Sequence, residues 1–70
     1  MALSARNQIT GTVTSIRTDG LMAEVVVDIG ATAPVVSVIT RSSAESLGLA
    51  EGTAVTVVIK STEVMLATAD

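Results

Sequence analysis

The residues from Leu21 to Ile29 alternate between apolar and mixed side chains with a period of two. The odd positions of this stretch are all apolar, namely Leu21, Ala23, Val25, Val27 and Ile29. Successive side chains of a β-strand point to opposite faces of the sheet, whereas a helix repeats every 3.6 residues. The pattern therefore predicts a strand that buries one face, and it indicates a fold built on β-structure.

Further stretches of the chain are rich in β-branched residues, which favour strands. They are residues 9–17, 35–40, 53–60 and, as a short last strand, 64–68. Turn-forming residues stand between them at 18–20, 30–34 and 51–52, and the first of these turns is expected to close a hairpin. Gly11 interrupts the first stretch, so we expect a bulge or a close backbone approach there.

A short helix is expected between the third and fourth strands. Ser42 to Glu45 matches the capping box Ser-x-x-Glu, in which each side chain satisfies a free N–H of the first turn. Gly48 stands where a left-handed C-terminal cap would follow. Five strands with one short helix predict an all-β fold, a small Greek-key barrel of the OB type.

A chain of this size needs a further source of stability. Its 70 residues make one domain at most, residues 1–70. A domain of about 60 residues buries only about 60% of its unfolded surface. Small folds add disulfides, metals or partner subunits, and this sequence has no Cys and no His. We therefore expect a homo-oligomer.

Apolar residues also occupy the strand face opposite the main apolar stripes. They are Met22, Val26, Val36, Val38 and Val58. Contiguous apolar patches are rare on monomers, so these residues predict a subunit interface. The alternative, that some of them belong to the core of a differently registered barrel, stays open.

Composition excludes several classes of function. A net charge of −3 and the absence of aromatic residues argue against nucleic acid, which needs cations for phosphates and rings for stacking. The longest uncharged run begins at Ile29 and stops before Arg41, too short to span a bilayer. No signal peptide is recognisable at the N-terminus, so a soluble cytoplasmic protein is expected. Without His or Cys the usual bases and thiol nucleophiles are missing, and we expect no enzyme.

Two of the four cations stand beside hydroxyl residues near the two ends of the chain. Arg6 follows Ser4 and precedes an amide pair, and Lys60 precedes Ser61 and Thr62. Fixed positive charges combined with hydroxyl and amide donors suit a tetrahedral dianion. The alternative is that Arg6 and Lys60 are solvated surface charges. Arg17 and Arg41 are interpreted as solvated or interface charges.

Hydroxyl groups gather at the start of the expected helix as well. Thr40, Ser42 and Ser43 lie where free backbone N–H groups favour an anion. Helix capping is the alternative role, and for Ser42 it is the favoured one.

Three segments of the sequence form a specific combination: residues 4–9 (SARNQI), 11–13 (GTV) and 58–65 (VIKSTEVM). Together with residues 23–26 (AEVV) and 46–49 (SLGL), they resemble the molbindins, the small molybdate-binding (Mop) proteins of bacteria. The resemblance covers essentially the whole chain, and the paired end motifs are its most specific part.

The resemblance implies an OB-like barrel that assembles into a ring-like homohexamer, a trimer of dimers. Molybdate or tungstate would be the bound ligand, held between subunits, for storage and homeostasis of the oxyanion. Ser4 and Arg6 of one subunit would meet a second group of residues from another subunit: Thr40, Ser43, Lys60 and Ser61. No metal ion would be coordinated directly by side chains. The family also has a second class of site, built from main-chain groups, to which no side chain is assigned here.

Two other functions remain open for such a chain. A similar domain serves as a molybdate-sensing regulatory module in transporters and in a repressor. A ring-forming protein without ligand would also suit the apolar composition, but it leaves the placement of Arg6 and Lys60 unexplained.

Overall fold

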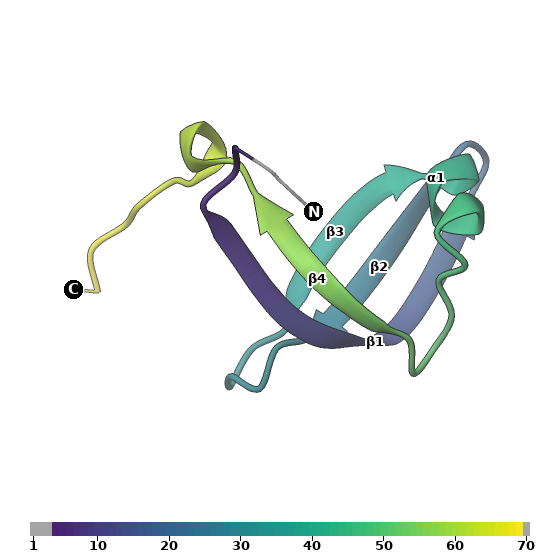
Figure 1. Ribbon diagram of the computed structural model, residues 1–70, viewed down its shortest axis with the longest axis horizontal. Coiled ribbons are helices and arrows are strands. Elements are labelled where there is room, and N and C mark those ends of the chain that lie inside the picture. The colour runs from purple at the N-terminus through teal and green to yellow at the C-terminus, as the bar shows by residue number, and fades with distance from the viewer. Residues whose placement is uncertain (1–3, 70) are drawn as a thin grey trace.

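Strand β1 (Asn7–Asp19) is long enough to pair with two different neighbours. In the computed structural model, which describes residues 4–69, its first half pairs antiparallel with β4 (Ala54–Ile59) and its second half with β2 (Met22–Asp28). Strand β2 pairs in turn with β3 (Val35–Thr40). The sheet order is β3-β2-β1-β4, and the sheet is strongly curled (Figure 1). This all-β, OB-like architecture agrees with the predicted fold class.

Two features of β1 accommodate this curvature. The register against β2 shifts between Val13 and Ser15, so that Thr14 is an extra residue, and such a bulge increases the local twist. At Gly11, a Cβ would lie 2.7 Å from the carbonyl oxygen of Asp28. No side chain fits at that distance, so the predicted close approach at Gly11 is confirmed, whereas the bulge lies three residues later.

The inner face of the curled sheet forms the core. Its buried side chains are Val13, Ala23, Val25 and Val27, and Ala44 of the helix is also buried. The alternation predicted for the second strand is therefore confirmed for its central residues. Leu21 is an exception, because it lies in the hairpin turn rather than in β2 and is 85% exposed.

Helix α1 (Arg41–Ser46) directly follows β3, as predicted, but its cap differs from the prediction. The N-cap is Thr40, whose Oγ1 accepts a hydrogen bond from the Ser43 N–H at 3.1 Å. The predicted capping box that starts at Ser42 is therefore wrong, because the chain enters the helix from the extended backbone of Thr40 without an intervening loop. Gly48 adopts a φ of +65° just after the helix, as the predicted left-handed cap requires.

The predicted fifth strand is not found within residues 4–69. A 3-10 turn, η1 (Ser61–Glu63), follows β4, and residues 64–69 form no regular strand. Figure 1 shows this tail running away from the sheet, and Met65 and Leu66 are 92% and 93% exposed. A strand needs a neighbour, and residues 64–69 take part in none of the strand pairings of the described chain.

Most of the apolar residues that sequence assigned to an interface lie on the outer face of the sheet, whereas Val58 lines a groove with Leu47 and Leu49. Met22, Val36, Val38 and Val58 are between 42% and 62% exposed, and Val26 is half-buried. The four exposed residues therefore do not belong to the core of this chain. Among the described residues no helix is long and apolar enough to cross a membrane.

Candidate anion-binding site

The pairing of β1 with β4 determines where the two end motifs lie. The ladder runs without a shift from Thr12 opposite Ala54 to Asn7 opposite Ile59, where it ends. The same register, continued one residue outward, sets Arg6 opposite Lys60. Lys60 keeps an extended backbone (φ −65°, ψ 134°), so the chain leaves the line of β4 only after it, in η1. The fold thus brings together two cations that are more than fifty residues apart in sequence.

Neither of these cations is neutralised by a carboxylate of residues 4–69. The ion pairs of this part of the chain join Arg17 to Glu24 at 3.6 Å and Arg41 to Glu45 at 3.5 Å. Arg17 and Arg41 are thus exposed charges with acidic neighbours, which agrees with the role expected for them. Arg6 and Lys60 are also exposed, and their charge is available to an anion.

Two side-chain amides fix the backbone around these cations. Asn7 Nδ2 donates to the carbonyl oxygen of Ile59 at 3.2 Å, across the ladder. Gln8 Nε2 donates to the carbonyl oxygen of Ala5 at 3.0 Å, within its own segment. Sequence reasoning treated these amides only as general donors and missed these contacts. Their position next to Arg6 was the available signal.

Hydroxyl groups flank the cations on both segments. Ser4 lies two residues before Arg6, and Ser61 begins η1 directly after Lys60; both are exposed. The turn itself is closed by the Glu63 N–H, which donates to the Lys60 carbonyl at 2.9 Å. Arg6, Lys60, Ser4 and Ser61 therefore lie at one end of the sheet, as donors without an acidic partner among the described residues.

The predicted hydroxyls at the helix lie at the other end of the sheet. Thr40 pairs with Met22, which pairs with Asp19 at the far end of β1 from Asn7. Thr40 Oγ1 lies 2.7 Å from Ser43 Oγ and 3.4 Å from Ser42 Oγ, so the three hydroxyls form one cluster. Figure 1 shows α1 and η1 on opposite sides of the molecule.

Within one chain, the grouping that the resemblance implied is therefore not found. Lys60 and Ser61 lie with Arg6, not with Thr40 and Ser43. The two groups lie at opposite ends of β1, which is 13 residues long. A single site that uses all of these residues needs at least two copies of the chain.

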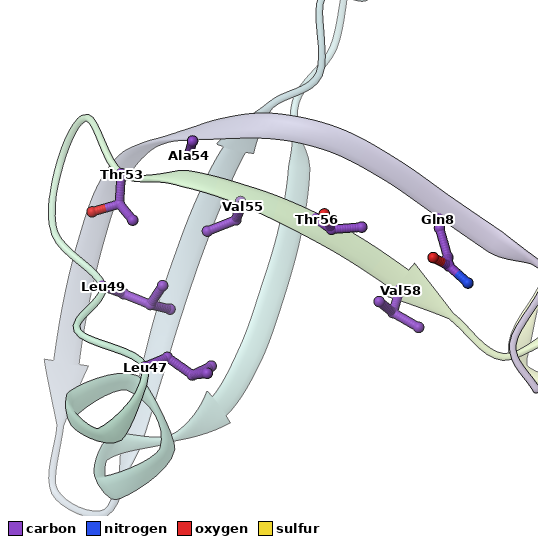
Figure 2. A pocket seen from close by; sticks show the side chains of 8 residues that line it. All are labelled: Gln8, Leu47, Leu49, Thr53, Ala54, Val55, Thr56 and Val58. Carbon is purple, nitrogen blue, oxygen red and sulfur yellow. The ribbon is translucent and has the colours of Figure 1, made fainter. Parts of the chain in front are cut away.

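The open groove between β4 and the loop after α1 has a different character. Its volume is about 390 Å³, and its lining residues are Gln8, Leu47, Leu49, Thr53, Ala54, Val55, Thr56 and Val58. Figure 2 shows the leucine and valine side chains gathered beneath β4, with Gln8 at the far end beside Val58. No cation lines this groove, so it is not built for an anion.

Comparison with known proteins places the chain in a family. Residues 3–66 match the family model described as TOBE domain. The "Molybdenum-pterin-binding protein 3" of Clostridium pasteurianum is 47% identical over 66 residues, which cover 94% of this chain and 97% of that protein. This chain therefore belongs to the TOBE-domain family, as a member of its molbindin group.

Solved structures agree with this assignment. A molybdate-binding protein from Sporomusa ovata superposes with a TM-score of 0.91 at 35% identity, covering 97% of this chain and 100% of that one. The molybdate-bound form of the cytoplasmic molybdate-binding protein ModG superposes with a TM-score of 0.81 at 38% identity. That match covers 86% of this chain and 43% of the ModG chain.

Proposed function

We propose that this chain binds molybdate, or the analogous tungstate, at the end of the β1–β4 ladder. The observation that carries the proposal is the β1–β4 register, which ends at Asn7 and Ile59 and, continued by one residue, sets Arg6 opposite Lys60; neither cation forms an ion pair among residues 4–69. Like charges opposite each other on neighbouring strands destabilise a sheet. A dianion between them removes this repulsion, because its two negative charges balance their two positive charges. The names of the relatives, which refer to molybdate and molybdenum, support this choice of ligand.

The site is completed by hydroxyl groups from two copies of the chain. Ser4 and Ser61 of one copy flank the cations, and Thr40 and Ser43 of a second copy supply donors from the opposite end of the sheet. Burying an ion costs several kcal/mol unless partners surround it, so two subunits that exclude water together must also provide the donors. Sulfate has the same charge and shape but shorter bonds, so it reaches fewer of these donors.

Assembly is part of the same proposal. Exposed apolar residues on the outer face and in the tail, such as Val38 and Leu66, support a homo-oligomer in which they are covered. We propose a hexamer arranged as a trimer of dimers, with anion sites between subunits. No nucleic acid or membrane partner is proposed, because the net charge is −3.

The biological role proposed is storage and homeostasis of the oxyanion in the cytoplasm, without catalysis. The relatives are described as binding proteins, and ModG is described as cytoplasmic. A site that holds the oxyanion through charge and hydrogen bonds releases it unchanged, which suits a store.

The name of the Clostridium relatives suggests a second ligand, a molybdenum-bearing pterin. Planar heterocycles are commonly held by stacking on aromatic side chains. This chain has no Phe, Tyr or Trp. The free oxyanion therefore fits the available side chains better than the pterin does.

The decisive experiment is isothermal titration of the protein with molybdate and tungstate, with sulfate and phosphate as controls, alongside native mass spectrometry. Saturable molybdate binding to a hexamer, with sulfate silent, is the expected result. The midpoint temperature of thermal unfolding should rise when molybdate is added, because a ligand at 100 times its Kd stabilises the folded protein by about 2.7 kcal/mol per site. A hexamer that ignores both oxyanions would leave only a structural ring and would refute the proposed function.

A further inference from the structure

The two residues that follow Arg6 each hold a particular backbone carbonyl. Asn7 Nδ2 donates to the Ile59 carbonyl at 3.2 Å, and Gln8 Nε2 donates to the Ala5 carbonyl at 3.0 Å. These carbonyls belong to the residues immediately before the two cations. The Asn7 amide thus holds the backbone just before Lys60, and the Gln8 amide holds the backbone just before Arg6.

Each contact fixes more than a single oxygen atom. A peptide group is planar, so holding the carbonyl of residue 59 also fixes the direction of the Lys60 N–H and the start of its backbone. The same holds for the carbonyl of residue 5 and the Arg6 N–H. Both cations therefore project from peptide planes whose orientation is set by a neighbouring side chain.

The position of Asn7 at the end of the ladder gives its contact a particular importance. Asn7 and Ile59 are the last register pair, and the terminal pairs of a ladder open most easily. Repulsion between Arg6 and Lys60 acts just beyond this pair and favours its opening. The Asn7 amide bridges the two strands at this point and opposes that opening.

We propose that Asn7 and Gln8 are positioning residues for the anion site, acting through Arg6 and Lys60. This inference rests on the proposed function. By holding the Ala5 and Ile59 carbonyls, the two amides keep the cations at the separation that one tetrahedral dianion bridges. Loss of one hydrogen bond of this kind is expected to weaken molybdate binding by about three- to tenfold.

A matched comparison separates positioning from general stabilisation. Asn7→Leu removes the amide at nearly constant size, and Asn7→Gln keeps an amide with a longer arm. Thr14→Val is the control, because Thr14 Oγ1 donates to the Val26 carbonyl at 3.2 Å and also joins two strands, but away from the cations. For each variant, the molybdate Kd is measured by titration, and the thermal midpoint is measured without ligand.

Asn7→Leu is expected to raise the Kd about three- to tenfold, with Asn7→Gln recovering most of the affinity. Thr14→Val is expected to shift only the thermal midpoint. If Asn7→Leu and Thr14→Val leave the Kd equally unchanged while the wild type binds, Asn7 has no positioning role and the inference is overturned. A wild type that does not bind molybdate overturns the proposed function instead.

Gln8→Leu supplies an independent test should Asn7→Leu fail to assemble. Gln8 is exposed and its hydrogen bond is local, so its removal leaves the fold and the ladder in place. A Kd raised about threefold or more supports the inference. An unchanged Kd for Gln8→Leu overturns the part assigned to Gln8, and with an unassembled Asn7→Leu it overturns the inference as a whole.

Discussion

The two ends of the sheet each carry two cations, which form ion pairs with carboxylates at one end but not at the other. At the α1 end, Arg17 and Arg41 each have a carboxylate within 4 Å, at Glu24 and Glu45. At the η1 end, Arg6 and Lys60 each follow on from the last register pair, Asn7 and Ile59, and neither forms an ion pair with a carboxylate of residues 4–69. Exposed ion pairs contribute at most about 1 kcal/mol, so leaving two cations without partners costs little stability. The difference supports the proposal that the anion binds where positive charge stays unneutralised, rather than wherever cations occur.

The largest effect on molybdate binding is expected from a substitution in the proposed subunit interface, because the α1 end of one copy and the η1 end of another would meet only in the assembly. Val38→Asp places a charge on the exposed apolar outer face, and a buried unpaired charge prevents association. We expect loss of the proposed hexamer by light scattering together with loss of measurable molybdate binding. Thr32→Asp adds the same charge in the exposed turn after β2 and should change neither. An intact hexamer in Val38→Asp would remove this face from the interface.

The comparison between the two ends is tested directly by removing one cation from each. Arg6→Ala should weaken molybdate binding by about a hundredfold, because charge-assisted hydrogen bonds contribute up to about 3 kcal/mol each. Arg17→Ala should change the Kd by less than about twofold, since exposed pairs contribute little. Titration of both variants, with native mass spectrometry to confirm assembly, measures the difference. Equal effects would contradict the assignment of Arg6 to the site.

The hydroxyls of the α1 end are expected to act both on stability and on binding. Thr40→Val removes the N-cap of α1 and should lower the free energy of unfolding by about 1 kcal/mol. Because Thr40 is proposed to reach the anion in a second copy, the Kd should also rise about tenfold. Thr53→Val is the matched control, since Thr53 Oγ1 also accepts a backbone N–H, from Ala50 at 3.0 Å. A Kd unchanged by Thr40→Val would confine Thr40 to capping.

A smaller effect is expected from the acidic residue nearest to Lys60 in sequence. Glu63 lies in η1 and carries the negative charge that follows Ser61. Glu63→Gln should strengthen molybdate binding by about twofold at low ionic strength, because screening limits the effect of exposed charges. The gain should vanish at high salt, and a weaker affinity instead would mean that Glu63 helps to shape the site.

The smallest effect is expected from freeing a cation at the other end. Glu45→Gln removes the partner of Arg41 and should lower the free energy of unfolding by about 0.5 kcal/mol at most. The number of molybdate ions bound per subunit should stay the same, because Arg41 has no second cation opposite it. An additional bound ion per subunit would show that a single unpaired cation is enough to bind molybdate.

Sequence alone predicted most of the fold because its strands follow local patterns. The alternation from Ala23 to Val27 and the close approach at Gly11 are both found in the structure. The cap was misplaced because Thr40 is both the last residue of β3 and the first to accept a helical N–H. The prediction of a last strand at residues 64–68 was wrong, because these residues favour a strand locally but have no neighbouring strand to pair with.

The residue types of the candidate site could be predicted from the sequence, but their arrangement in space could not. Arg6 and Lys60 could be chosen because hydroxyls and amides surround them in sequence. Their opposition depends on the long-range register between β1 and β4, which no local pattern specifies. The contact of Asn7 follows from that register, and the contact of Gln8 depends on the path of the chain before β1, so both became visible only in the structure.

The divided pairing of β1 has a consequence for handling the protein. Residues 7–11 pair only with β4 and residues 15–19 only with β2, so each half of β1 leaves one side open, in addition to the outer edges of β3 and β4. Open strand edges are templates for aggregation. If the proposed hexamer forms, a subunit released from it by dilution would expose these edges and tend to precipitate, so working stocks would best be kept concentrated and supplied with the oxyanion.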